Sequence, residues 1–227
     1  AASFGVSRAV IRDATRMLAA RGLVQAQHGR GVFVTESQAA AFGEALLLAL
    51  RRSEASVWDV EQFEQMVFPE VCALASISAS DADLAKIKSL GEVYIELFSI
   101  TAAYWQNEET APEADLESLR ESFIALIRSI FVATDNKLWQ LLAGPILHLR
   151  STRDWDAVGI EVEAAIAFER RYVETLVTAV ALRDPVQARK IVSQLMVLPL
   201  EAEDAMRETA VGEIPHISVS IAKETGR

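Results

Sequence analysis

Regularly spaced arginines near the start of the chain are the residues whose chemistry is easiest to state. Arg8, Arg12 and Arg16 recur every four residues, which places them on one face of a helix. Apolar residues recur on another face with the i, i+3, i+4, i+7 spacing of an amphipathic helix, so we predict a helix over residues 7–21, capped by Ser7. Guanidinium groups on the first two turns of such a helix can bind phosphates and base edges. The alternative for all three arginines is a solvated helix face.

A short hairpin is predicted to follow this helix. Residues 23–26 and Gly31–Val34 have the composition of two short strands, joined by residues 27–30. A capped helix that follows a tight turn is what a helix-turn-helix places in the DNA major groove, and the hairpin would be its wing. The wing tip would enter the adjacent groove, although His28 could instead be an exposed loop histidine. The predicted DNA contacts are Ser7, Arg8, Arg12, His28, Gly29 and Arg30.

These residues resemble part of the winged helix-turn-helix of the GntR family of bacterial transcription factors. The matching words are FGVSR, the R-D-A…L-A-A-R-G-L-V run and the G-R-G-V-F-V wing. The resemblance implies a regulator that binds a double-stranded DNA operator. Because palindromic half-sites require two-fold symmetry, it also implies a homodimer. The family's domain begins with a further helix and the first part of a second, so we expect an N-terminally truncated sequence with a partial DNA-binding domain over residues 1–35.

Net charge divides the chain into two unlike parts. Residues 1–34 hold five arginines against one aspartate, a net charge of +4, whereas the whole chain carries −10, which leaves −14 for residues 35–227. A basic module on an acidic body confines polyanion binding to one end. The single cysteine, Cys72, excludes an internal disulfide and lies in an apolar run typical of a buried core. With no membrane-spanning run and no signal peptide visible, we expect a cytoplasmic protein without a membrane partner.

Helical periodicity dominates from residue 36 onward. Cap-rich breaks such as Ser80-Asp81, and a proline at the first helical position, Pro185, separate the periodic segments. The fold class predicted is therefore mostly α: a partial winged helix-turn-helix, an all-α antiparallel bundle of six or seven helices over residues 36–208, and a tail over residues 209–227. The predicted helices are Ala39–Arg52, Val57–Ser78 and residues 81–104, 114–133, 137–150, 159–182 and 185–206.

The helical part resembles the effector domain of the FadR subfamily of GntR regulators. The resemblance rests on short sequence motifs within residues 123–138 and 176–188. Many members of this superfamily bind a divalent metal through an Asp-x-x-x-His pair and two further histidines. The resemblance places the four ligand positions at residues that provide no such ligand set: Arg120, Ile124, Val173 and Leu195. It therefore implies the branch without a metal or other cofactor, whose known type binds acyl-CoA.

A small organic acid or an acyl thioester is the effector that these observations favour. Apolar side chains at the former metal positions would hold its hydrocarbon part. The arginines at 150, 153, 170 and 171 either form a solvated face paired with acids or bind its anionic head. His148 is either a core or pocket-wall histidine or a ligand contact. The candidate effector-binding residues are Ile124, His148, Arg150, Arg153, Val173 and Leu195.

The sequence carries no motif of a common enzyme class. It has no glycine-rich phosphate loop and no CxxC, HExxH or GxSxG motif, and its three histidines and one cysteine are too few for most nucleophilic or metal sites. We therefore expect a protein that is not an enzyme. The alternative to a regulator is a helical ligand-binding or scaffolding protein whose winged-helix remnant no longer binds DNA. A further basic amphipathic helix encoded upstream would favour the regulator.

Overall fold

The computed structural model describes residues 5–20, 23–27, 31–34, 39–107, 109–151, 162–198 and 200–211. These residues form a mostly helical fold with one two-stranded antiparallel sheet, as the sequence predicted. None of the described helices is both long and apolar enough to cross a bilayer. The elements in chain order are α1 (Arg8–Ala20), β1 (Val24–Gln27), β2 (Gly31–Val34), α2 (Ala39–Arg52), α3 (Val57–Ser78), α4 (Asp81–Gln106), α5 (Glu113–Ala133), α6 (Lys137–Ser151), α7 (Val162–Ala181), α8 (Pro185–Leu195) and α9 (Leu200–Glu208).

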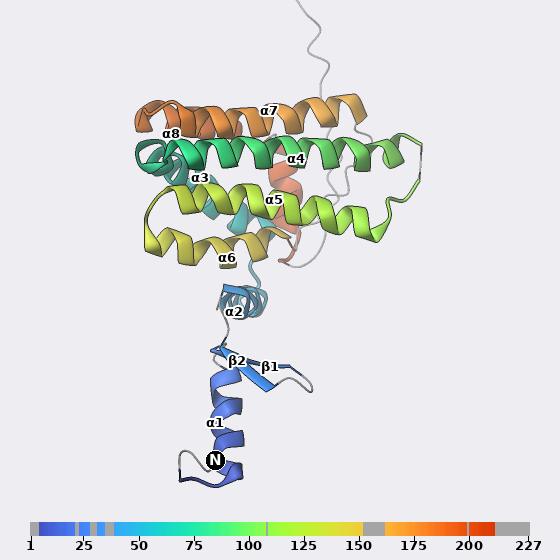
Figure 1. The fold of residues 1–227 in the computed structure, drawn as a ribbon. Coiled ribbons are helices and arrows are strands. Elements are labelled where there is room, and N and C mark those ends of the chain that lie inside the picture. The colour runs from blue at the N-terminus through green and yellow to red at the C-terminus, as the bar shows by residue number, and fades with distance from the viewer. Residues whose placement is uncertain are drawn as a thin grey trace, which may run out of the picture.

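The N-terminal elements α1, β1 and β2 form a small unit. Ser7 caps α1, because its Oγ accepts a hydrogen bond from the Val10 N–H at 3.3 Å. The Leu23 N–H donates to the Leu18 carbonyl at 2.9 Å and leads the chain from α1 into the hairpin. In Figure 1 this unit projects from the helical body on the side of α2.

The helical body has two layers. Figure 1 shows α7, α4, α5 and α6 side by side in one layer, with α3 and α8 behind them. The core between the layers is apolar and continuous; Phe68 of α3 and Phe131 of α5 meet edge to face with their ring centroids 5.9 Å apart. Burial of such aromatic pairs stabilises a core beyond the area that they remove from water. α3 is the central helix, since it contacts α5, α7 and α8.

Local capping explains where two of the longest helices begin. Ser56 and Asp59 form a reciprocal capping box at the start of α3, and Ser80 and Asp83 form a second one at the start of α4. In each box the serine Oγ accepts from a backbone N–H and the aspartate accepts from the serine backbone. Asp184 caps α8 in front of Pro185. The sequence analysis used the signals of α4 and α8, Ser80-Asp81 and Pro185, and the predicted starts of all three helices agree with the structure.

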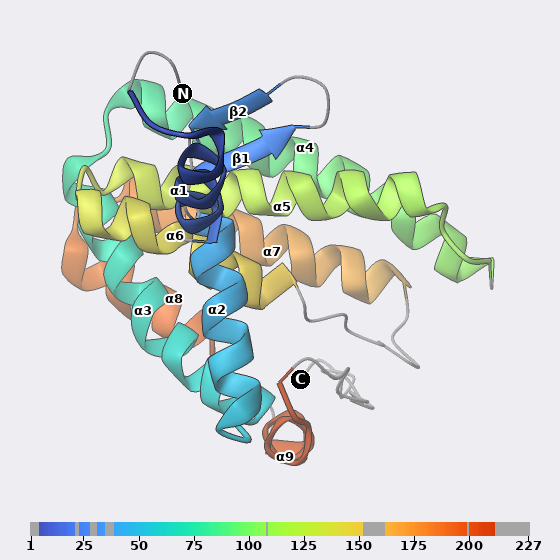
Figure 2. The ribbon, with the colours of Figure 1, turned by 90° about the horizontal axis from the view of Figure 1, so that it is seen from below.

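α2 lies at the end of the body nearest the N-terminal unit (Figure 1), and Figure 2 shows α2 crossing α6. α2 approaches α6 closely at Gly43, where an added Cβ would lie 2.7 Å from the Cβ of His148. Only a residue without a side chain tolerates that approach. α9 packs on the start of α3 through Ala202 and Met206. α2 is thus the helix through which the chain passes from the hairpin into the body.

The last predicted helix is divided into two helices in the structure. Residues 185–206 were predicted as a single helix, but α8 ends at Leu195 and α9 begins at Leu200. The sequence has a proline at position 199, and a proline disfavours helical backbone in the residue before it. Beyond α9, residues 209–211 pair with residues 55–57 through the Val57 N–H to Thr209 carbonyl bond and the Val211 N–H to Ala55 carbonyl bond.

Candidate nucleic-acid interface and effector body

α1 presents basic side chains on its first two turns. Arg8 and Arg12 are exposed, and neither forms an ion pair with any residue that the structure describes. The only acid of α1, Asp13, instead lies 3.9 Å from Arg16. The guanidinium groups of Arg8 and Arg12 are therefore the ones left to bind an anion. The partial positive charge of a helix N-terminus adds to the attraction.

The hairpin predicted from the sequence is confirmed. Val24 pairs with Val34 and Gln27 pairs with Gly31, so the connecting segment is residues 28–30. Strand β1 begins one residue later than predicted, because its pairing partner β2 ends at Val34. Gly31 has φ +111°, a backbone conformation that L side chains rarely adopt. The predicted contact residues His28, Gly29 and Arg30 lie outside the described residues, and their role stays a prediction.

An apolar stripe on α1 faces solvent. Val10, Met17 and Leu18 are 52%, 61% and 40% exposed, and no side chain of α1 is buried. Val32 and Phe33 of β2 are also about half exposed. The helix is amphipathic, as its sequence predicted, but no described residue covers its apolar face. Such a stripe is typical of a surface that another segment covers.

The four positions that the sequence resemblance assigned to metal ligands contain a packed core and an ion pair. Val173 of α7 is buried against Gly91 of α4, and Ile124 and Leu195 are half-buried against the same core. Arg120 pairs with Glu117 one turn earlier on α5. Within the described ranges no three His, Cys, Asp or Glu side chains gather into a group that could hold a metal ion.

The other predicted effector residues are less fully placed. His148 is half-buried on α6 beside α2. It does not belong to the group of Val173, Ile124 and Leu195, which pack on the main core. Arg153 and the side chain of Arg150 lie outside the described residues. The grouping of all six into one effector site stays a prediction.

A polar contact inside the bundle escaped the sequence analysis. The Tyr94 hydroxyl of α4 donates to the Glu169 carboxylate of α7 at 2.9 Å. The Tyr94 ring packs beside two other aromatic rings, Phe123 at 5.2 Å and Phe98 at 6.1 Å, centroid to centroid. The two partners are 75 residues apart in the chain, and no local pattern connects them.

Comparison with known proteins bears on the N-terminal unit first. Residues 1–34 match the family model described as bacterial regulatory proteins, gntR family. Over 88 residues the chain is 31% identical to the HTH-type transcriptional regulator LutR of Bacillus subtilis (strain 168); this match covers 39% of the chain and 40% of that relative. The chain thus matches less than half the length of this curated relative.

The fold of the whole chain is similar to that of a solved structure described as Streptococcus agalactiae GntR. The TM-score is 0.58 with 14% sequence identity, and the similarity covers 86% of this chain and 82% of the other. At this identity the likeness concerns the fold alone. This fold similarity includes the helical C-terminal part of the chain.

Proposed function

We propose that this protein is a ligand-responsive transcription regulator that acts in the cytoplasm as a homodimer on double-stranded DNA. One observation carries the proposal: the segment that matches the gntR family model forms a capped helix with two exposed arginines that have no acid partner among the described residues, followed by a hairpin. A recognition helix needs this combination, because its N-terminal turns meet base edges while the wing contacts the neighbouring groove.

Each residue of the interface then has a chemical task. Arg8 and Arg12 donate to phosphate oxygens or to the acceptors of guanine in the major groove. Ser7, whose Oγ already accepts from the Val10 N–H, retains a hydroxyl proton to donate to the DNA. His28, Gly29 and Arg30 approach the adjacent groove from the hairpin. Two copies related by a two-fold axis place two such units on the half-sites of a palindrome.

Tight DNA binding should require that the exposed apolar stripe of α1 is covered. A recognition helix must be held rigidly to read bases, and α1 presents Val10, Met17 and Leu18 to solvent. A further amphipathic segment that packs on this stripe would fix the helix. Residues 1–227 alone should therefore bind DNA more weakly than a protein that includes this segment.

The helical body is the sensor in this proposal. Its core at Ile124, Val173 and Leu195 is apolar, which suits an effector with a hydrocarbon part. α2 connects the hairpin to α6, so a ligand that shifts α6 would change the spacing of the two DNA-binding units. The effector class proposed is a small organic acid or an acyl thioester.

Selection of binding sites from a random DNA library tests the proposal. The full gene product should enrich a short palindrome and bind it in a saturable manner, in competition with unrelated duplex. A protein that enriches no sequence, yet is stabilised by a small acid in thermal-shift measurements, would instead be a helical ligand-binding protein with a winged-helix remnant. That outcome would contradict the DNA-binding role.

A further inference from the structure

A groove runs between α7 and α8 on the outside of the body. Its α7 wall is one helix face, since the spacing is i, i+3, i+4 and i+7, and its α8 wall is a second face with the spacing i, i+3 and i+4. The groove holds about 430 Å³ and is open to solvent, which is within the size range of small-molecule sites. Its lining residues are Arg171, Glu174, Thr175, Thr178, Ile191, Gln194 and Leu195.

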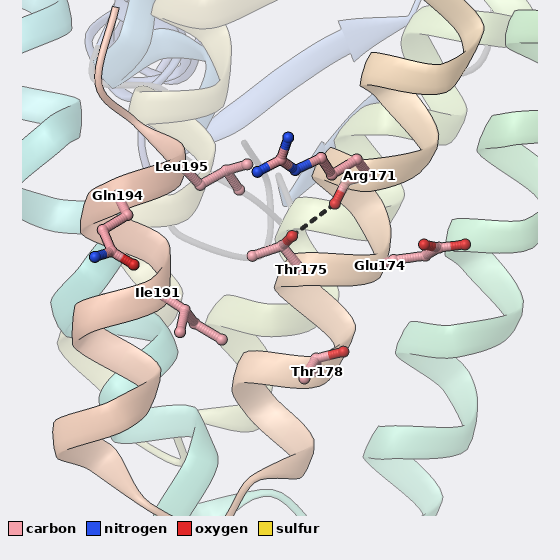
Figure 3. A pocket seen from close by; sticks show the side chains of 7 residues that line it. All are labelled: Arg171, Glu174, Thr175, Thr178, Ile191, Gln194 and Leu195. Atoms are coloured by element: carbon pink, nitrogen blue, oxygen red, sulfur yellow. Dashed lines mark hydrogen bonds between the residues drawn. The ribbon is translucent and has the colours of Figure 1, made fainter. Parts of the chain in front are cut away.

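Small side chains create the groove. α7 and α8 are neighbouring helices joined by a turn at Arg183, whose φ is +55°. Thr175 and Thr178 leave space on α7 where longer side chains would fill it. The Thr175 hydroxyl donates to the Arg171 carbonyl at 2.7 Å, and Figure 3 shows the rest of that side chain turned toward α8. The floor is apolar, because Ile191 and Leu195 pack on the main core from this side.

One cation dominates the groove. Figure 3 shows the Arg171 side chain extended across it toward Leu195, whereas the Glu174 carboxylate points away from α8. Arg171 forms no ion pair with a described residue. By contrast, Arg189 on the same pair of helices is held by Glu70, and Arg183 lies 3.1 Å from Asp81. Arg171 thus lies over the apolar floor without an ion pair to a described residue; its neighbour Arg170 has none either, but it does not line the groove.

We propose that the α7–α8 groove binds a small organic monoanion, with its carboxylate on Arg171 and its hydrocarbon part on Ile191 and Leu195. A guanidinium binds a carboxylate through charge-assisted hydrogen bonds, and the Gln194 amide can donate a further one. The acidic body, with a net charge of −14 over residues 35–227, repels polyanions at longer range. This disfavours a phosphate-rich thioester and favours a short acid.

The inference rests on the proposed function only in calling this ligand the effector; the binding site itself is independent of DNA. Methyl-labelled isoleucine and leucine residues of the 227-residue chain report on the floor directly by NMR. Hexanoate should shift the methyl signals of Ile191 and Leu195 in a saturable manner. Hexan-1-ol, which lacks the charge, and inorganic phosphate, which lacks the chain, should each bind about tenfold or more weakly than hexanoate.

Two substitutions and a control variant test whether hexanoate binds in the α7–α8 groove. Arg171→Gln should weaken hexanoate binding about tenfold or more, whereas Arg128→Gln, an exposed arginine of α5 outside the groove, should change it less than about twofold. Thr178→Leu fills the groove without altering charge and should also weaken binding, which guards against an indirect effect of the first substitution.

Several results would overturn the site: equal losses in both arginine variants, phosphate binding as tightly as hexanoate, methyl shifts confined to other residues, or no saturable shift with any probe. None of them would bear on DNA binding, because the assay contains no DNA. Conversely, failure to select a DNA sequence would leave hexanoate binding unaffected.

Discussion

The arginines of α1 differ in whether an acidic side chain lies beside them. Asp13 lies beside Arg16, whereas Arg8 and Arg12 have no acid among the described residues and remain exposed. The sequence predicted all three on one face and chose Arg8 and Arg12 as DNA contacts because they lie on the first two turns; the structure adds the acid beside Arg16. A single acid at the i+3 spacing decides which guanidinium groups are available to an anion.

Arg12→Ala should therefore reduce specific DNA binding by roughly 1–3 kcal/mol for each half-site, because one base or bidentate contact is lost from each subunit of the dimer. Arg52→Ala, an exposed arginine on α2, serves as the control and should leave the affinity almost unchanged. Fluorescence anisotropy at fixed salt measures both. Wild-type affinity and selectivity in the Arg12 variant would remove this residue from the interface.

Cys72 is a residue whose burial has a direct chemical consequence. It is fully buried in α3, and burial raises the pKa of its thiol to about 12. Because the thiolate is the reactive form, the native protein should react very slowly with a maleimide at pH 8. The same thiol should react readily in denaturant. Fast modification of the folded chain would show that α3 opens locally, contrary to its place in the core.

Gly91 tests how closely α4 and α7 approach each other. A Cβ at this position would lie 2.6 Å from Cγ1 of Val173, so Gly91→Ala should lower the free energy of unfolding by about 1–3 kcal/mol through overpacking. Val173→Ala removes the obstructing methyl groups at the cost of a cavity. The double variant should lose less than the sum of the two single losses in urea unfolding. Strict additivity would mean that the two residues do not touch.

At the scale of elements, the sequence predicts what local chemistry determines. The starts of α3, α4 and α8 follow from Ser56, Ser80 and Asp184 together with the residues next to them. The contacts that build possible ligand sites are not local. The Tyr94–Glu169 bond and the groove between Arg171 and Leu195 depend on which helices become neighbours, and no periodicity within a single helix specifies that.

The capping box of α4 makes a further prediction about elements. Hydrogen bonds from the Ser80 hydroxyl and backbone N–H, at 2.6 and 2.9 Å, lower the pKa of Asp83. A carboxyl whose pKa is lowered by folding stabilises the protein above its unfolded pKa of about 3.9, and that contribution disappears as the pH falls through the folded pKa. Asp83→Asn should therefore be less stable than wild type at pH 7, with a deficit that shrinks toward pH 3.

Ser80→Ala should lose about 0.5–2 kcal/mol at neutral pH for the same reason, since the cap of α4 is lost. Glu121→Gln, an exposed position in the middle of α5, is the control and should show little change at either pH. Chemical denaturation followed by circular dichroism gives these values. A deficit in Asp83→Asn that does not depend on pH would contradict a role for the ionised carboxyl.

At the scale of the whole molecule, the separation of charge determines how DNA binding responds to salt. The basic N-terminal unit carries +4 and the remainder carries −14. Only the contacts of the N-terminal unit release counterions from the duplex, so the logarithm of the affinity should fall steeply with the logarithm of salt concentration. Loss of one phosphate contact reduces that slope by about 1.

Arg8→Gln uses this slope to report the assembly state on DNA. In a homodimer each substitution removes two contacts, so the slope should fall by about 2 if Arg8 binds phosphate, rather than by about 1 as in a monomer. Arg128→Gln on α5, an exposed arginine of the acidic body, should leave the slope unchanged. Anisotropy titrations of the full gene product across a salt series measure all three proteins. A slope that falls by about 1 would contradict the dimer, and an equal effect of Arg128→Gln would mean that the acidic body also touches the duplex.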